Sequence, residues 1–261
     1  MNELRYVYAV TRPFEGVLPD GTCGLDGEPP RLLHHDGLVA VVSPVPAEDF
    51  DEVPLRAHLE DLDWLTGTAR AHQGVVAALG TVTCPLPLRL ATVCHDDSGV
   101  RRLLDSGRER FTATLERLDG RVEWGVKVYV DPDPEPRGRP RAPEPPATGR
   151  DYLRRRLQER RSREGDWARA DALSNRLHGE LGRHAEAGKL HRPQNAQLSG
   201  APGTNVLNAA YLVPRESCET FVGHVRRLTP QQPGIRVELT GPWAPYSFAD
   251  LPGLPAGEAA R

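Results

Sequence analysis

The sequence lacks the features that place a chain in a membrane or direct it to secretion. No run approaches the roughly 18 apolar residues of a membrane-spanning helix, and the N-terminal MNELRYVYAVTRPFEG has no basic stretch followed by an apolar core. The cysteines form no C-x-x-C pair, which argues against a disulfide framework. We therefore expect a cytoplasmic protein that meets any hydrophobic phase only through its surface. The four cysteines are Cys23, Cys84, Cys94 and Cys218.

Lysine is almost missing, and so are the common catalytic motifs. Of 33 basic residues only Lys127 and Lys189 are lysine, so lysine-dependent catalysis has few candidates. The net charge of −3 argues against nucleic-acid binding, which needs a basic field. The phosphate-binding, dinucleotide-binding, zinc-protease and serine-hydrolase motifs are also missing. We expect no enzyme, no cofactor, no metal and no small-molecule substrate.

Apolar periodicity in the first half predicts alternating strands and helices. The Gly/Pro-rich segment 13–30 is expected to be a loop or a weakly paired strand. One long helix is expected from Pro54 to Leu79, and Asp96 to Ser98 can cap a second helix that runs to Leu118. The predicted strands cover residues 4–10, 38–42, 88–93 and 122–130.

The second half begins with a proline-dense insert, 131–149, which we expect to be flexible or polyproline-like. A charged helix over 151–187 follows, and its apolar stripe includes Leu153, Leu157, Ala170, Leu173, Leu177 and Leu181. After a loop over 190–203 come a strand (207–213), a helix (216–228) and a strand (235–240).

This alternation suggests a ferredoxin-like variant. The predicted class is α+β with two domains. These are an N-terminal α+β domain (1–119) and a modified ferredoxin-like α/β sandwich with a long charged helix (120–251). A disordered tail follows (252–261).

Seven segments, in order from Leu4 to Leu251, together resemble the GvpF/GvpL gas vesicle family. Each alone is an ordinary hydrophobic strand or helix, and the ordered set carries the resemblance. The segments are LRYVYAV, LVAVVSPVPAEDF, LDWLTGTARAHQGVVAAL, PLPLRLATV, VEWGVKVYVD, LNAAYLVP and RVELTGPWAPYSFADL.

The resemblance implies an accessory or minor structural protein of gas vesicles. Such a protein would bind the small hydrophobic shell protein and other gas vesicle accessory proteins, and would support vesicle assembly in the cytoplasm. It also implies two α+β domains, the second modified ferredoxin-like. The alternative function is a ligand-binding regulatory module, because ferredoxin-like domains commonly sense small molecules.

Two groups of side chains are candidates for an interaction surface. Trp243, Tyr246 and Phe248 lie among prolines in GPWAPYSF, where aromatic residues can form a rigid contact surface or close a core. An arginine run that includes Arg154, Arg155 and Arg161 could dock an acidic partner, or could be a solvated helix face offset by nearby acids.

Histidines raise further alternatives. His58 and Asp61 are three residues apart and could share a metal ion, or could belong to an ordinary polar helix face. His72 falls on an apolar stripe, where it could fix packing or act as a pH-sensitive switch. Neither His34-His35 nor Cys94-His95 has the spacing of a zinc site.

Overall fold

The computed structural model describes residues 3–131, 149–193, 203–229 and 234–249, without the side chains of 149, 151, 152, 155 and 158–164. The chain divides into two compact units. The first contains Met1–Glu123 and the residues from Pro242 onward, and the second contains Trp124–Gly241. Residues 242–251, which we predicted to belong to the second domain, cluster with the first unit. The insert expected over 131–149 and the tail expected over 252–261 lie, except for Asp131 and Gly149, outside the described residues.

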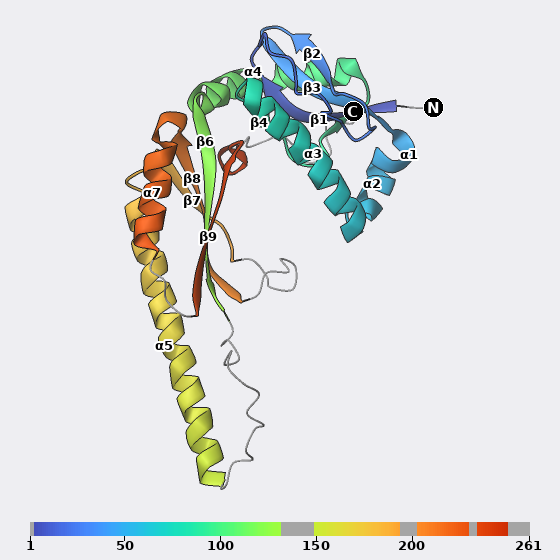
Figure 1. The fold of residues 1–261 in the computed structure, drawn as a ribbon. Coiled ribbons are helices and arrows are strands. Elements are labelled where there is room, and N and C mark those ends of the chain that lie inside the picture. Colours follow the sequence, from blue (N-terminus) through green and yellow to red (C-terminus); the bar gives the residue numbers. More distant parts are fainter. Residues whose placement is uncertain (1–2, 132–148, 194–202, 230–233, 250–261) are drawn as a thin grey trace. The chain divides into compact units, whose positions relative to one another are not determined.

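The first unit is built on a five-stranded sheet (Figure 1). Four of its strands lie in the order β2-β3-β1-β4, and the short strand β5 also pairs with β1. All pairings with β1 are antiparallel, and the long β1–β3 ladder shifts register between Val7 and Ala9. The strands are β1 (Glu3–Thr11), β2 (Arg31–His35), β3 (Leu38–Pro46), β4 (Leu86–Pro87) and β5 (Val93–Cys94).

Helices cover both faces of this sheet. Tyr6 to Thr11 of β1 are all buried, and because successive side chains of a strand point to opposite faces, both faces must be covered. α3 (Leu62–Val82) packs Val75, Val76 and Leu79 onto the face that carries Tyr6 and Tyr8. α4 (Asp97–Leu118) contacts the same strands and lies behind the sheet in Figure 1.

The long helix predicted from Pro54 to Leu79 is wrong in one respect, because it is two helices. α1 (Ala47–Phe50) and α2 (Glu52–His58) precede a break at residues 59–61, and α3 starts at Leu62. Asp61 is extended and its carboxylate accepts hydrogen bonds from the backbone N–H groups of Asp63 and Trp64. An N-cap of this kind starts a helix even where the apolar periodicity is continuous.

The second unit is a four-stranded sheet in the order β7-β8-β6-β9. With helices after β6 and β8, the chain order is βαββαβ, which confirms the ferredoxin-like expectation. α5 and α7 pack on one face, where Leu173, Leu177, Leu181, Phe221 and Val225 join the core. The elements are β6 (Arg121–Val130), α5 (Gly149–Leu181), β7 (Ala187–Leu190), β8 (Thr204–Pro214), α7 (Cys218–Leu228) and β9 (Ile235–Trp243).

α5 is longer than the sheet that it covers (Figure 1). Its 33 residues extend about 50 Å at 1.5 Å each, whereas the ten residues of β6 extend about 33 Å. The predicted apolar stripe is therefore buried only from Ala170 to Leu181, and Leu153 and Leu157 are exposed. The helix also ends at Leu181 rather than at residue 187, and β7 was not predicted.

Two other strand predictions were incomplete. β2 was missed, because its burial pattern leaves only Leu33 fully buried. The strand predicted over 88–93 is replaced by a turn between β4 and β5, in which Ala91 has a φ of 62°.

None of the described helices is long and apolar enough to cross a lipid bilayer.

Candidate functional site

The aromatic residues of GPWAPYSF do not form a single contact surface. Phe248 is buried in the first unit, where its backbone carbonyl accepts a hydrogen bond from Arg117. Trp243 is 41% exposed at the end of β9. Phe248 is thus a core residue of the first unit, and Trp243 remains available for contact.

Two hydrogen bonds anchor this segment. The backbone N–H and the hydroxyl of Ser247 each donate to the carboxylate of Glu123 at 2.7 Å. The neighbouring Tyr246 ring lies 6.2 Å from the His72 ring, and burial, followed by the charge of Glu123, raises the pKa of the Tyr246 phenol. The short 3-10 turn η2 (Tyr246–Phe248) is therefore fixed to the first unit by partly buried hydrogen bonds, while the Tyr246 side chain is 38% exposed.

His72 is buried under this segment, as the apolar stripe suggested. The Tyr6 hydroxyl accepts a hydrogen bond from the N–H of Ala91 at 3.1 Å and is hydrogen-bonded to His72 Nδ1 at 2.9 Å, with the tautomer of the imidazole setting which of the two donates. Burial lowers the pKa of His72 to about 4, and Nε2 is buried without a hydrogen-bond partner among the described residues. The imidazole is neutral near pH 7 and joins β1, α3 and the β4–β5 turn.

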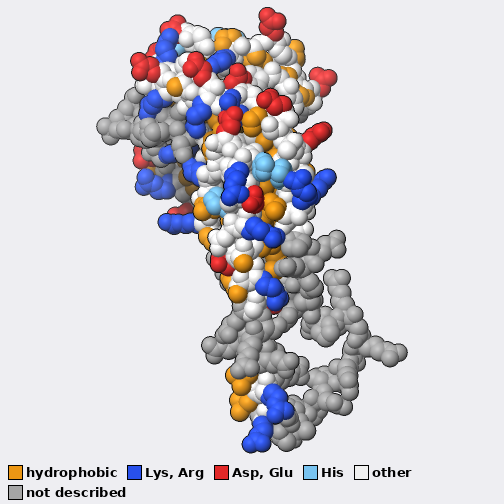
Figure 2. Space-filling model, turned by 90° about the vertical axis from the view of Figure 1, so that its left-hand side faces the viewer, with side chains coloured by type: hydrophobic (Ala, Val, Ile, Leu, Met, Phe, Trp, Pro, Cys, Tyr) orange, Lys and Arg blue, Asp and Glu red, His pale blue; other side chains and the backbone are white. Residues whose placement is uncertain are grey.

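The arginine candidates lie on α5, in the other unit. Arg154 is exposed, and the side chains of Arg155 and Arg161 lie outside the described residues. Figure 2 shows hydrophobic and basic side chains side by side at the lower end of this helix. Leu153 is 63% exposed and Leu157 is 57% exposed there.

The proposed metal pair of His58 and Asp61 is not brought together. His58 stacks on the Trp64 ring with centroids 5.0 Å apart, and its Nε2 lies 3.4 Å from the carboxylate of Asp49. The Asp61 carboxylate caps α3. The two side chains thus stabilise the two sides of the α2–α3 break.

A different histidine has acidic neighbours. The ligand atoms of His35, Asp36 and Asp105 lie within 4.8 Å of one another. Arg108 donates to Asp36 at 2.5 Å and to Asp105 at 2.9 Å, so one guanidinium bridges the two carboxylates and offsets one of their two negative charges. Sequence reasoning missed this cluster because Asp105 is 70 residues from His35.

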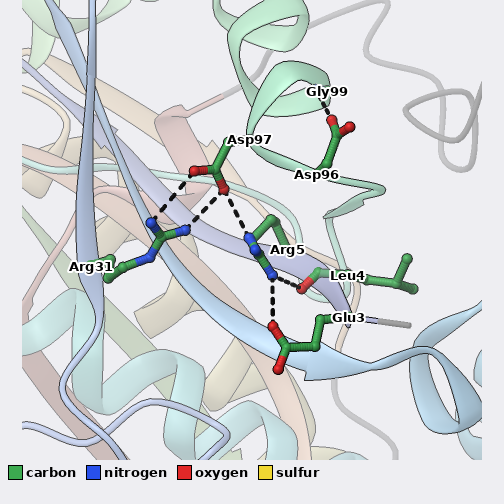
Figure 3. A network of polar contacts seen from close by, with 7 residues as sticks. All are labelled: Glu3, Leu4, Arg5, Arg31, Asp96, Asp97 and Gly99. Carbon is green, nitrogen blue, oxygen red and sulfur yellow. Dashed lines mark hydrogen bonds and ion pairs between the residues drawn. The ribbon is translucent and has the colours of Figure 1, made fainter. Parts of the chain in front are cut away.

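An ion-pair network joins the starts of β1, β2 and α4 (Figure 3). Asp97 accepts from Arg5 Nε at 2.8 Å and from Arg31 Nη2 at 2.9 Å. Both hydrogen bonds lower the pKa of Asp97, and the bond from Arg31 has the larger effect. Asp96 accepts from the Gly99 N–H at 2.7 Å and caps α4. The network has a structural role, since its charges are matched.

The second unit has a shallow depression of about 370 Å³ between the end of α5 and the start of α7. His184 on its wall stacks on His224 with ring centroids 3.5 Å apart. Burial lowers the pKa of His224, and Arg227 and His184 add to this effect. Histidine and basic side chains gather on the face shown in Figure 2. The depression is lined by Arg183, His184, Ala185, Glu186, Pro214, Glu216, Ser217, Thr220 and Phe221.

The surface around the α2–α3 break combines exposed apolar side chains with negative charge. Val53 is 81% exposed, Leu62 is 65% exposed and Leu59 is 41% exposed. Residues 48–63 contain seven carboxylates and one arginine, a net charge of −6 in a chain whose total is −3. We call residues 48–63 the acidic corner. Helix capping explains Asp51 and Asp61, but it does not explain the exposed apolar side chains.

Comparisons with known proteins agree on one family. Residues 4–250 match the family model described as gas vesicle synthesis protein GvpL/GvpF. The chain is 67% identical to gas vesicle protein L of Streptomyces sp. (strain CB03234), over 96% of this chain and 94% of that relative. It is 29% identical to gas vesicle protein F of the same strain, over 94% of this chain and 99% of that relative.

The solved structure of the gas vesicle protein GvpF from Anabaena sp. PCC7120 has a similar fold. The two superpose with a TM-score of 0.65 and 19% identity, over 95% of this chain and 97% of that one. The same α+β fold therefore spans both halves of the chain.

Proposed function

The chain belongs to the GvpL/GvpF family of gas vesicle synthesis proteins, and we propose that it is a non-catalytic accessory protein that binds the hydrophobic shell protein and supports vesicle assembly. The observation that carries this proposal is the match over nearly the whole chain, which includes both units rather than one shared module. The family is one of gas vesicle accessory proteins rather than of enzymes. We place its action in the cytoplasm, with gas vesicles.

The physical task follows from the nature of a gas-facing shell. A shell subunit must carry an apolar face before it is assembled, and such a face aggregates in water. Covering a few hundred Å² of apolar surface contributes several kcal/mol to the free energy of binding, at about 25 cal/mol per Å². A partner that covers this face reversibly would keep the subunit available for ordered growth.

Exposed apolar side chains of this chain are suited to that task. Trp243 at the end of β9, and Leu59 and Leu62 at the acidic corner, all lie open on the first unit. These side chains support a mechanism of contact through a surface rather than through a closed pocket.

Deletion and rescue in the source strain test the role in assembly. Removing every gene of this family should abolish or distort the vesicles, and a plasmid copy of this chain should restore them in part or in full. Electron microscopy of thin sections gives the measurement. Normal vesicles in the strain without any family member would refute the proposal.

Binding of the shell protein is tested separately. Purified chain, mixed with shell subunit diluted out of denaturant, should keep the subunit in solution, as measured by light scattering and by recovery on affinity resin. An unrelated protein of similar size and charge is the control. If the subunit aggregates at the same rate with either protein, direct shielding is wrong. Vesicles washed with urea and then probed for the chain show whether it stays attached.

A further inference from the structure

The acidic corner has a chemical complement on the same chain, at the N-terminal end of α5. Residues 150–163 contain seven arginines and two carboxylates, a net charge of +5. Leu153 and Leu157 are exposed in this part of the helix. The chain therefore carries an acidic segment and a basic segment, and each has exposed apolar side chains among its described residues.

The basic surface lies on one side of α5. Arg150, Leu153, Arg154 and Leu157 are spaced i, i+3, i+4 and i+7, so they follow one another along a single helix face. Both arginines and both leucines are exposed. The leucines are exposed because the sheet beneath α5 does not extend as far as this end of the helix. We call these four residues the basic face of α5.

The acidic corner can receive such a helix. Glu60 and Asp63 lie on either side of Leu62, and both are exposed without an ion pair to a described residue. Val53, 81% exposed on α2, adds an apolar side chain next to these charges. A leucine pair flanked by arginines would meet apolar side chains flanked by carboxylates.

We propose that the acidic corner of one molecule binds the basic face of α5 of a second molecule. The occupant is another copy of this chain, and the argument is the complementarity of charge and apolar exposure between the two surfaces. The contact joins different surfaces on the two partners, so it is heterologous and can extend into chains of molecules. It goes beyond the proposed shell-protein binding and does not depend on it.

A contact of this size is transient. Each side offers only a few anchoring side chains, which is characteristic of small interfaces with micromolar dissociation constants. Exposed charges are screened within about 8–10 Å at physiological salt. Self-association should therefore be measurable at low salt and should weaken as salt is added.

Sedimentation velocity and light scattering on the full-length chain test this contact. At about 0.05 M NaCl the mean mass should rise between roughly 1 and 100 µM protein, and at about 0.5 M NaCl it should stay close to that of a monomer. A wild-type chain that stays monomeric at every concentration at low salt overturns the proposal, and so does association that salt does not weaken.

Charge reversal gives the decisive comparison. Glu60→Arg with Asp63→Arg should abolish self-association, and so should Arg150→Glu with Arg154→Glu. An equimolar mixture of these two double variants should associate again, because the first keeps the basic face and the second keeps the acidic corner. If the mixture stays monomeric, the pairing of these two surfaces is wrong.

Matched controls separate the contact from general charge and folding effects. Asp20→Arg with Glu109→Arg makes the same change of charge at exposed acids of the first unit and should leave association unchanged. Val53→Ser with Leu62→Ser should weaken association about tenfold, whereas Val17→Ser, at a side chain 86% exposed, should not. Thermal melts confirm that each variant is folded. Equal loss in the control variants would overturn the proposal.

Discussion

Replacing His72 with asparagine should remove a large part of the acid sensitivity of the first unit. Asparagine places an amide, which can donate or accept, near the position of Nδ1, the atom hydrogen-bonded to the Tyr6 hydroxyl at 2.9 Å, but it does not titrate. The smaller side chain leaves a cavity, so the variant should be less stable at pH 7 by about 1–3 kcal/mol. The informative quantity is the change of this difference with pH.

The size of this change in stability with pH follows from the pKa of His72. Burial lowers it from 6.5 to about 4, so in the window between these values the unfolded chain binds a proton that the folded chain does not. The contribution of His72 to stability is therefore complete above pH 6.5 and is lost as the pH falls towards 4. Between about pH 7 and pH 5 the wild type should lose about 2 kcal/mol through this residue alone.

Urea unfolding at a series of pH values is the assay. The ring centroid of Trp64 lies 5.4 Å from that of Phe50 in the first unit, so Trp64 contributes to the tryptophan fluorescence that follows unfolding. Other titrating groups are common to both proteins, so they cancel in the difference between wild type and His72→Asn. The two stability curves should converge by about 2 kcal/mol on going from pH 7 to pH 5. Parallel curves would refute the buried, neutral imidazole.

Four further substitutions, one of them a control, test other features of the first unit. Gly24→Ala would bring a Cβ within 2.8 Å of the Tyr8 hydroxyl and should lower the free energy of unfolding, measured in urea, by about 1–3 kcal/mol. The control Gly74→Ala, in open space on α3, should raise the free energy of unfolding by about 0.5–1 kcal/mol. Equal effects of the two substitutions would contradict the packing of the loop around Gly24. Asp97→Asn should cost up to about 1 kcal/mol at low salt and less at high salt, and a loss that salt does not reduce would contradict the ion-pair network. Asp61→Ala should cost about 1 kcal/mol and reduce helical circular dichroism, and an unchanged spectrum would show that α3 does not need this cap.

The fold class and most helices and strands could be predicted from the amino-acid sequence, because hydrophobic periodicity is a local property. The strand at the N-terminus, the helix ending at Leu118 and the strands and helices of the second half other than β7 follow from apolar spacing. The burial of His72 was also readable, since it occupies a position of the α3 stripe. The ordered segments were enough to identify the family.

Which of these residues contact one another became known from the folded chain. The length of the second sheet left Leu153 and Leu157 exposed although they continue a buried stripe. The assignment of residues from Pro242 onward to the first unit put Phe248 in a core that lies far earlier in the sequence. Burial and pairing depend on contacts between distant segments, and no local pattern records which partner a strand or a helix face will find.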